Sequence, residues 1–210
     1  MNPTPAPIGI ASPGDGDELA RADLYGVLAQ LWLAAPDEAL RTAMASAVTQ
    51  APQPGGLLEA SWEQLVGAVR SVDADAAAAE YEALFLGVGK PEVFLYGSYY
   101  LSGFLHEKPL ALLRTDLAAL GLTRDGDRGE TEDHVAYVLE VMRYLIAGDE
   151  VEVCNLEQQR RFFRAHLQPW LEALCDAVES HPRAVVWAAL ARLTRAFVQV
   201  EAQAFDLLEA

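Results

Sequence analysis

Apolar residues recur at three- and four-residue spacing in one segment of this chain after another. That spacing places them on one face of an α-helix. No segment shows a competing strand pattern. The chain contains 36 Ala and 30 Leu but only three Ile, a surplus of helix formers over β-branched residues. The sequence therefore predicts an all-α fold, a single-domain helical bundle.

Proline, glycine and polar residues divide the periodic segments into a bundle of roughly nine or more helices. Asp17 and Thr131 are the expected N-caps of the first helix and of the strongly periodic one after the middle of the chain. Gly121 is expected at the C-cap of another helix. Residues 51–56 are read as a connector. The predicted helices span 18–33, 37–49, 57–71, 74–86, 108–120, 132–147, 153–167, 169–180 and 182 onward.

Residues 1–16 are predicted to form a disordered N-terminal tail. This stretch is rich in Pro and Gly and has no Lys or Arg, so it lacks the basic and apolar regions of a secretion signal. Residues 17–210 are expected to form one domain. Within it, the polar, glycine-containing residues 123–129 indicate a hinge over 121–131. Because a flexible connector permits domain exchange, a monomer and a domain-swapped homodimer both stay open.

Composition and charge exclude several kinds of partner. Fifteen basic against 31 acidic residues leave a net charge of −16, which repels phosphate backbones and anionic lipid surfaces. Nucleic acid is therefore not an expected partner. No apolar run approaches the ~20 residues that span a bilayer, so stable membrane insertion is not expected either. Cys154 and Cys175 form no CxxC motif, and reduced thiols in a cytoplasmic protein are predicted.

The stretch from residue 81 to residue 101 is not explained by helix packing alone. Tyr81, Leu84 and Phe85 share a helical face, and core packing is the better reading of Leu84 and Phe85 on pattern alone. The helix must then end near Gly87. The charge-free aromatic run of residues 94–101 follows, with four hydroxyl groups in five residues. Burying four hydroxyl groups together costs free energy unless each finds a hydrogen-bond partner, so a partly exposed groove is predicted there.

An acidic cluster with one histidine, made of Glu130, Glu132, Asp133 and His134, lies at the start of the predicted helix of 132–147. Adjacent helical residues point about 100° apart, so Glu132, Asp133 and His134 cannot converge on one metal ion, and only Glu130 and His134 share a face. The chain also lacks nucleophile, phosphate and dinucleotide motifs. We therefore expect no enzyme, no catalytic residue, no metal and no cofactor. The Asp133 carboxylate either stabilises the first helical turn or accepts an arginine guanidinium, and both readings stay open.

These residues resemble the TorD/DmsD/NarJ family of cytoplasmic chaperones for molybdenum-containing respiratory enzymes. The resemblance covers roughly residues 21–208. It rests on Y-x-x-L-F from Tyr81, aromatic-x-Ser at Tyr96, E-x-x-D-H from Glu130, and Q-x-x-F-F-x-x-H-L-x-P-W from Gln159. Leu95 and Thr131 stand where the family often has proline, which leaves the subfamily open.

The resemblance implies a chaperone that binds the twin-arginine signal peptide, the precursor of a molybdopterin-containing oxidoreductase, or both. It would delay export until the cofactor is inserted. A NarJ-like chaperone of a non-exported catalytic subunit is the nearest alternative; a helical metal-dependent enzyme and a scaffold without a peptide pocket are others. By this analogy, the peptide-binding residues are Tyr81, Leu84, Phe85, Tyr96, Ser98, Tyr99, Glu130, Asp133 and His134.

Overall fold

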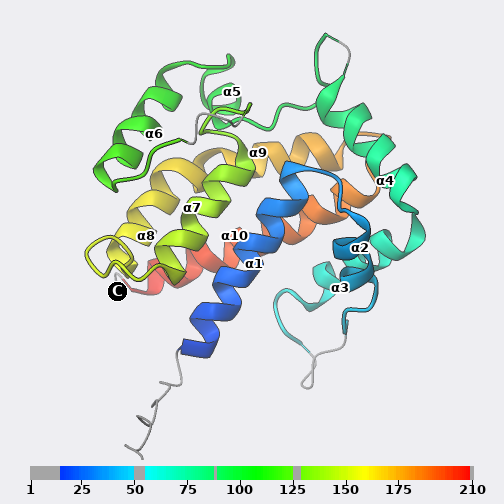
Figure 1. Ribbon diagram of the computed structural model, residues 1–210, viewed down its shortest axis with the longest axis horizontal. Coiled ribbons are helices and arrows are strands. Elements are labelled where there is room, and N and C mark those ends of the chain that lie inside the picture. The colour runs from blue at the N-terminus through cyan, green and yellow to red at the C-terminus, as the bar shows by residue number, and fades with distance from the viewer. Residues whose placement is uncertain (1–14, 50–54, 88, 125–128, 209–210) are drawn as a thin grey trace, which may run out of the picture.

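The protein folds into an all-α, single-domain bundle, as predicted (Figure 1). The computed structural model describes residues 15–49, 55–87, 89–124 and 129–208. The α-helices are α1 (Asp15–Leu33), α2 (Glu38–Ala45), α3 (Glu59–Ser71), α4 (Ala74–Tyr81), α5 (Gly97–Ser102), α6 (Lys108–Ala119), α7 (Val135–Ala147), α8 (Leu156–Phe162), α9 (Gln168–Glu179) and α10 (Val186–Leu207). Two π-helical turns, η1 (Glu82–Leu86) and η2 (Phe163–Leu167), continue α4 and α8.

Helices α1, α7, α9 and α10 form the centre of the bundle, and α10 runs behind α1 in the view of Figure 1. Helix α1 packs along α7, and α10 packs on α9 and α3. The core between them is rich in aromatic rings: Trp32, Trp170 and Trp187 are fully buried. Large apolar side chains of this kind contribute roughly 1.5–3 kcal/mol each on burial, so this core supplies most of the stability.

Polar contacts tie distant helices together. The Glu80 carboxylate on α4 accepts hydrogen bonds from the backbone N–H groups of Val185, Val186 and Trp187, at 2.8, 3.2 and 3.0 Å. It thereby caps the start of α10, whose first N–H groups have no partner within the helix. On the same helix, buried Glu201 binds the Arg21 guanidinium of α1 at 2.7 Å.

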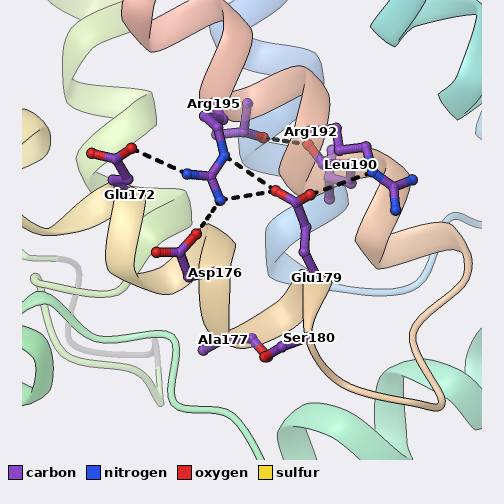
Figure 2. A network of polar contacts seen from close by, with 9 residues as sticks. Glu172, Asp176, Ala177, Glu179, Ser180, Leu190, Arg192 and Arg195 are labelled. Carbon is purple, nitrogen blue, oxygen red and sulfur yellow. Dashed lines mark hydrogen bonds and ion pairs between the residues drawn. The ribbon is translucent and has the colours of Figure 1, made fainter.

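A surface network of ion pairs joins α9 to α10 (Figure 2). Arg195 on α10 lies among three carboxylates of α9, at 2.6 Å from Asp176, 2.9 Å from Glu179 and 3.3 Å from Glu172. Arg192 also binds Glu179, at 3.4 Å. The network links the two helices at the surface, where exposed members such as Glu172 add little stability singly.

Three of the predicted helix ends are wrong. Asp17 lies inside α1, which begins at Asp15. The N-cap of α7 is His134 instead of Thr131, because the Thr131 hydroxyl donates to Asp133 at 2.7 Å instead of capping the helix. Helix α10 begins at Val186, four residues after Pro182. Smaller differences shift the end of α2 to Ala45 and the start of α8 to Leu156.

The glycine expected at the end of α6 does close that helix. Gly121 has φ of +73° and follows the C-cap Leu120. The N–H of Leu122 donates to the carbonyl of Leu117 at 2.9 Å, and that of Gly121 to Ala118 at 3.1 Å. This pair of bonds is a Schellman motif, in which glycine adopts the left-handed conformation without strain.

The expected tail lies outside the described residues, except that residues 15 and 16 begin α1. Residues 125–128 of the expected hinge also lie outside them. In the part of the chain that is described, no helix is long and apolar enough to cross a bilayer.

Candidate functional site

Two of the segments singled out in the sequence lie side by side. An isolated antiparallel bridge pairs Tyr96 with His134. The N–H of Val135 donates to the carbonyl of Leu95 at 2.8 Å, and the N–H of Gly97 to that of Asp133 at 2.9 Å. The aromatic-x-Ser segment (residues 95–98) and the acidic segment (residues 130–134) therefore lie together, as one unit, between α5 and α7.

Asp133 holds this unit together from within. Its side chain is 3% exposed, and both oxygens have partners. Oδ2 accepts from the N–H of Ser98 at 2.9 Å, and Oδ1 accepts from the Thr131 hydroxyl at 2.7 Å. Hydrogen bonds to a buried carboxylate are among the stronger ones in proteins. Because the side chain is buried, a guanidinium could reach Asp133 only if the residues that cover it moved.

His134 is equally buried and serves as the N-cap of α7. Its Nδ1 accepts the N–H of Ala136 at 3.2 Å, and its ring lies against the rings of Tyr96 and Tyr137, at centroid distances of 5.2 and 5.7 Å. Burial lowers the pKa of His134 to about 4, although the charges of Glu130 and Asp133 act in the opposite direction. The imidazole is therefore neutral at pH 7.

Tyr96, Tyr99 and Glu130 are the predicted site residues that keep part of their surface in solvent. The Tyr96 hydroxyl donates to Oε2 of Glu130. Burial, and then this hydrogen bond to a carboxylate, raise the pKa of Tyr96. The ring of Tyr99 packs on Phe94 at a centroid distance of 4.2 Å. These three side chains form the accessible face of the unit.

Tyr81, Leu84 and Phe85 lie in the core, so the structure favours the packing interpretation of their pattern. Leu84 is fully buried, and the other two are 7% exposed. The ring of Trp187 lies 5.3 Å from Tyr81 and 6.0 Å from Phe85. The Tyr81 hydroxyl donates to the carbonyl of Leu33 at 2.6 Å.

The Gln159 to Trp170 stretch packs against α5 through its last residue, Trp170. The Trp170 indole N–H donates to the carbonyl of His166 at 2.6 Å. Its ring stacks with Tyr100 at 6.0 Å and lies so close to Gly97 that a Cβ there would meet Cε2 at 2.9 Å. The first residue of α5 must therefore be glycine for the helix to rest on this tryptophan.

A groove of about 990 Å³ opens between α1, α7 and the end of α6, and the acidic segment forms part of its wall. Its charged lining comprises three carboxylates, Asp23, Glu132 and Glu140, and two arginines, Arg124 and Arg143. Its apolar lining comprises Val27, Leu33, Leu117, Leu122, Tyr137 and Val141. Sequence reasoning missed this groove, because its residues come from three helices whose separate patterns are ordinary. Glu132, noticed as part of the acidic cluster, was the only signal.

Two of the groove carboxylates are bound to arginines of the chain itself. Glu132 accepts from Arg114 on α6 at 2.8 and 3.0 Å. Burial is the largest single influence on the pKa of Glu132 and raises it, but the hydrogen bond from Arg114, a backbone hydrogen bond and the charges of Arg114 and Arg124 together lower that pKa below its ordinary value. Glu140 accepts from Arg143 at 2.5 and 2.8 Å. Glu132 is thus ionised at neutral pH, as a site for a cationic ligand requires.

No cluster of three or more His, Cys, Asp or Glu side chains arranged to hold a metal ion occurs among the described residues. The His166 imidazole pairs with Asp116 at 2.7 Å beside a smaller cavity of about 220 Å³.

Comparison with known proteins identifies relatives. The profile of a family described as nitrate reductase delta subunit matches residues 52–176. The chaperone protein TorD of Vibrio cholerae serotype O1 (strain ATCC 39541) is 30% identical over 138 residues, which cover 62% of this chain and 63% of the relative. TorD of Shewanella loihica is 28% identical over 138 residues, 60% and 61% of the two chains. TorD of Photobacterium profundum is 26% identical over 133 residues, 60% and 62%. The alignments thus span less than two thirds of each relative's length.

Proposed function

The chain belongs to the nitrate reductase delta subunit family, and we propose that it is a cytoplasmic maturation chaperone, not an enzyme. Its client is a molybdopterin-containing oxidoreductase, bound through the twin-arginine signal peptide, the rest of the precursor, or both. The relatives that it resembles are named chaperones. By occupying the signal peptide, the protein would delay export until the cofactor has been inserted.

The groove between α1, α6 and α7 is the observation that carries this proposal. A twin-arginine signal joins two adjacent guanidinium groups to an apolar segment. The groove offers an excess of acidic over basic side chains, Asp23, Glu132 and Glu140 against Arg124 and Arg143, beside an apolar lining. Its volume of about 990 Å³ accommodates several side chains of a peptide. Charge complementarity of this kind directs both encounter and orientation.

The nine residues predicted from the sequence take different parts in this proposal. None of the nine lines the groove, so Tyr96, Tyr99 and Glu130, which present polar and aromatic surface, would contact only a part of the client that lies outside it. Ser98, Asp133 and His134 would act by holding the acidic segment in place, since their polar atoms are engaged. Tyr81, Leu84 and Phe85 would act from the core, where they set the position of η1.

Titration calorimetry with the signal peptide of a molybdoenzyme encoded beside this protein tests the proposal. Micromolar binding, about −8 kcal/mol, is expected. Val141→Gln places a polar group in the apolar lining without changing charge, and should weaken binding about tenfold. Val151→Gln is the matched control, because Val151 is 81% exposed and lies outside the groove. If no such signal peptide binds the folded protein, the signal-peptide assignment is contradicted.

A second candidate is favoured by the description of the matching family, which names a nitrate reductase subunit. In that case the client would be a catalytic subunit that is not exported, and the groove would take its N-terminal segment. Titration with N-terminal peptides of such subunits, which lack a cleavable twin-arginine signal, distinguishes the two candidates. The peptide class that binds with the higher affinity identifies the client.

A further inference from the structure

One ion pair joins α6 to the acidic segment at the wall of the groove. Nε and Nη2 of Arg114 lie 3.0 and 2.8 Å from Glu132. The two residues are 18 positions apart, on either side of the mid-chain segment 121–131. The Glu132 side chain is 14% exposed, whereas that of Arg114 is 50% exposed. The arginine therefore covers the carboxylate from the solvent side.

The geometry of this pair is not the best that a guanidinium and a carboxylate can reach. Both nitrogens of Arg114 donate to the same oxygen, Oε2 of Glu132. A fork-to-fork contact uses both oxygens and is stronger and more specific. A guanidinium that enters along the groove and engages both oxygens would be the better partner for Glu132.

We propose that Arg114 is an internal competitor that occupies Glu132 until an arginine of the client replaces it. This inference rests on the proposed function, because it assigns Glu132 as the carboxylate that receives the client's guanidinium. The exchange conserves ion pairs, so it favours arginine over residues that cannot form the fork. It also releases the tie between α6 and the start of α7.

The competition sets the affinity of the groove. Arg114 must give up its contact with Glu132 before the client can form its own, and this cost reduces the observed affinity. Because Arg114 is half exposed, its ion pair is of the modest, solvent-screened kind. Removal of the competitor should therefore tighten binding of an arginine peptide by about fivefold.

The test is a calorimetric titration of three proteins with two peptides. The proteins are wild type, Arg114→Gln and the control Arg161→Gln. Arg161 also forms one ion pair with α6, to Asp116 at 3.2 Å, and is 64% exposed, so the control removes the same charge outside the groove. The peptides are a twin-arginine signal peptide and the same sequence with both arginines replaced by glutamine. We expect Arg114→Gln to bind the arginine peptide about fivefold more tightly than the control does, with no such gain for the glutamine peptide.

A double-mutant cycle of Arg114 and Glu132 tests whether the two residues act together. When Glu132→Gln is combined with Arg114→Gln, the gain from removing Arg114 should vanish, because the residue for which it competes is gone. Arg114→Lys keeps the charge without the fork and should bind between wild type and Arg114→Gln. Thermal unfolding confirms that each variant is folded.

The outcomes separate the inference from the function on which it rests. If wild type binds the arginine peptide and Arg114→Gln binds it no better than Arg161→Gln does, the competition is overturned and the chaperone proposal stands. An equal gain for both peptides also overturns it, since the effect would not depend on the client's guanidinium. If wild type binds neither peptide, the signal-peptide function and this inference both fail.

Discussion

The carboxylate of Asp133 accepts the backbone N–H of Ser98 at 2.9 Å, across 35 residues of chain. This bond joins the start of α5 to the segment that leads into α7, and it is buried. The N-cap residue of α5, Tyr96, makes no capping hydrogen bond with its side chain, and Asp133 supplies one instead. Asp133, the acid that the sequence most strongly suggested as a ligand contact, therefore links two segments of the fold in this structure.

Substitution of Asp133 by alanine should lower the free energy of unfolding by about 2–3 kcal/mol, because it leaves the buried N–H of Ser98 without its acceptor. Urea denaturation measures the change. Asp149→Ala, at an exposed acid beyond α7, is the control and should stay within about 0.5 kcal/mol of wild type. Equal stability of both variants would show that Asp133 does not hold the unit together.

Two glycines should respond to alanine in opposite ways. At Gly97 a Cβ would meet the Trp170 ring at 2.9 Å, so Gly97→Ala should destabilise the protein by about 1–3 kcal/mol. At Gly67, inside α3, nothing lies within 4 Å, and Gly67→Ala should stabilise it by about 0.5–1 kcal/mol. Differential scanning calorimetry reads both effects, and a shift in the same direction for both would refute the packing assigned to Gly97.

His134 should make stability fall with acid. Burial holds its pKa at about 4 in the folded protein, below the ordinary value of 6.5. The unfolded chain therefore takes up a proton that the folded one does not, and stability is lost as the pH falls from 6.5 towards 4. The loss from this group approaches about 3 kcal/mol.

Chemical denaturation across that pH range tests this dependence. His134→Asn keeps a side chain that can cap α7 but cannot titrate, so the difference in unfolding free energy between wild type and variant should shrink as the pH falls. His181→Asn, at a half-buried histidine after α9, serves as the control. A difference that stays constant from pH 7 to pH 4 would count against the shifted pKa.

Cys175 should be unreactive in the folded protein. It is fully buried, and burial raises the pKa of its thiol to about 12, which leaves almost no thiolate at neutral pH. N-ethylmaleimide should therefore modify only Cys154, which is half-buried, and a second label should appear on unfolding. Mass spectrometry with a Cys154→Ser variant distinguishes the two sites. Rapid labelling of that variant under native conditions would contradict the burial of Cys175.

Much of the fold was predictable because local signals agreed with one another. The apolar spacing of Val135, Val138, Leu139 and Met142 predicted a helix with this face inward, and all four are buried. Gly121 closes α6 through its left-handed conformation, a property of the residue itself. The start of α7 was missed because Thr131 has a competing partner in Asp133, which no local pattern reveals.

The candidate site was predictable only in part. The sequence singled out the segments around Tyr96 and Asp133, and the structure places them together. The sequence could not show which polar side chains still face solvent. Asp133 and His134 are satisfied inside the fold, whereas Glu132 stands at the wall of the groove.

The sequence by itself determined the all-α class, the order of the main helices and the acidic character, because helix propensity, apolar periodicity and charge are properties of residues and their near neighbours. Tertiary structure alone decided the groove and the pairing of Glu132 with Arg114. Those features depend on how α1, α6 and α7 pack, and that packing follows from contacts between side chains far apart in the chain.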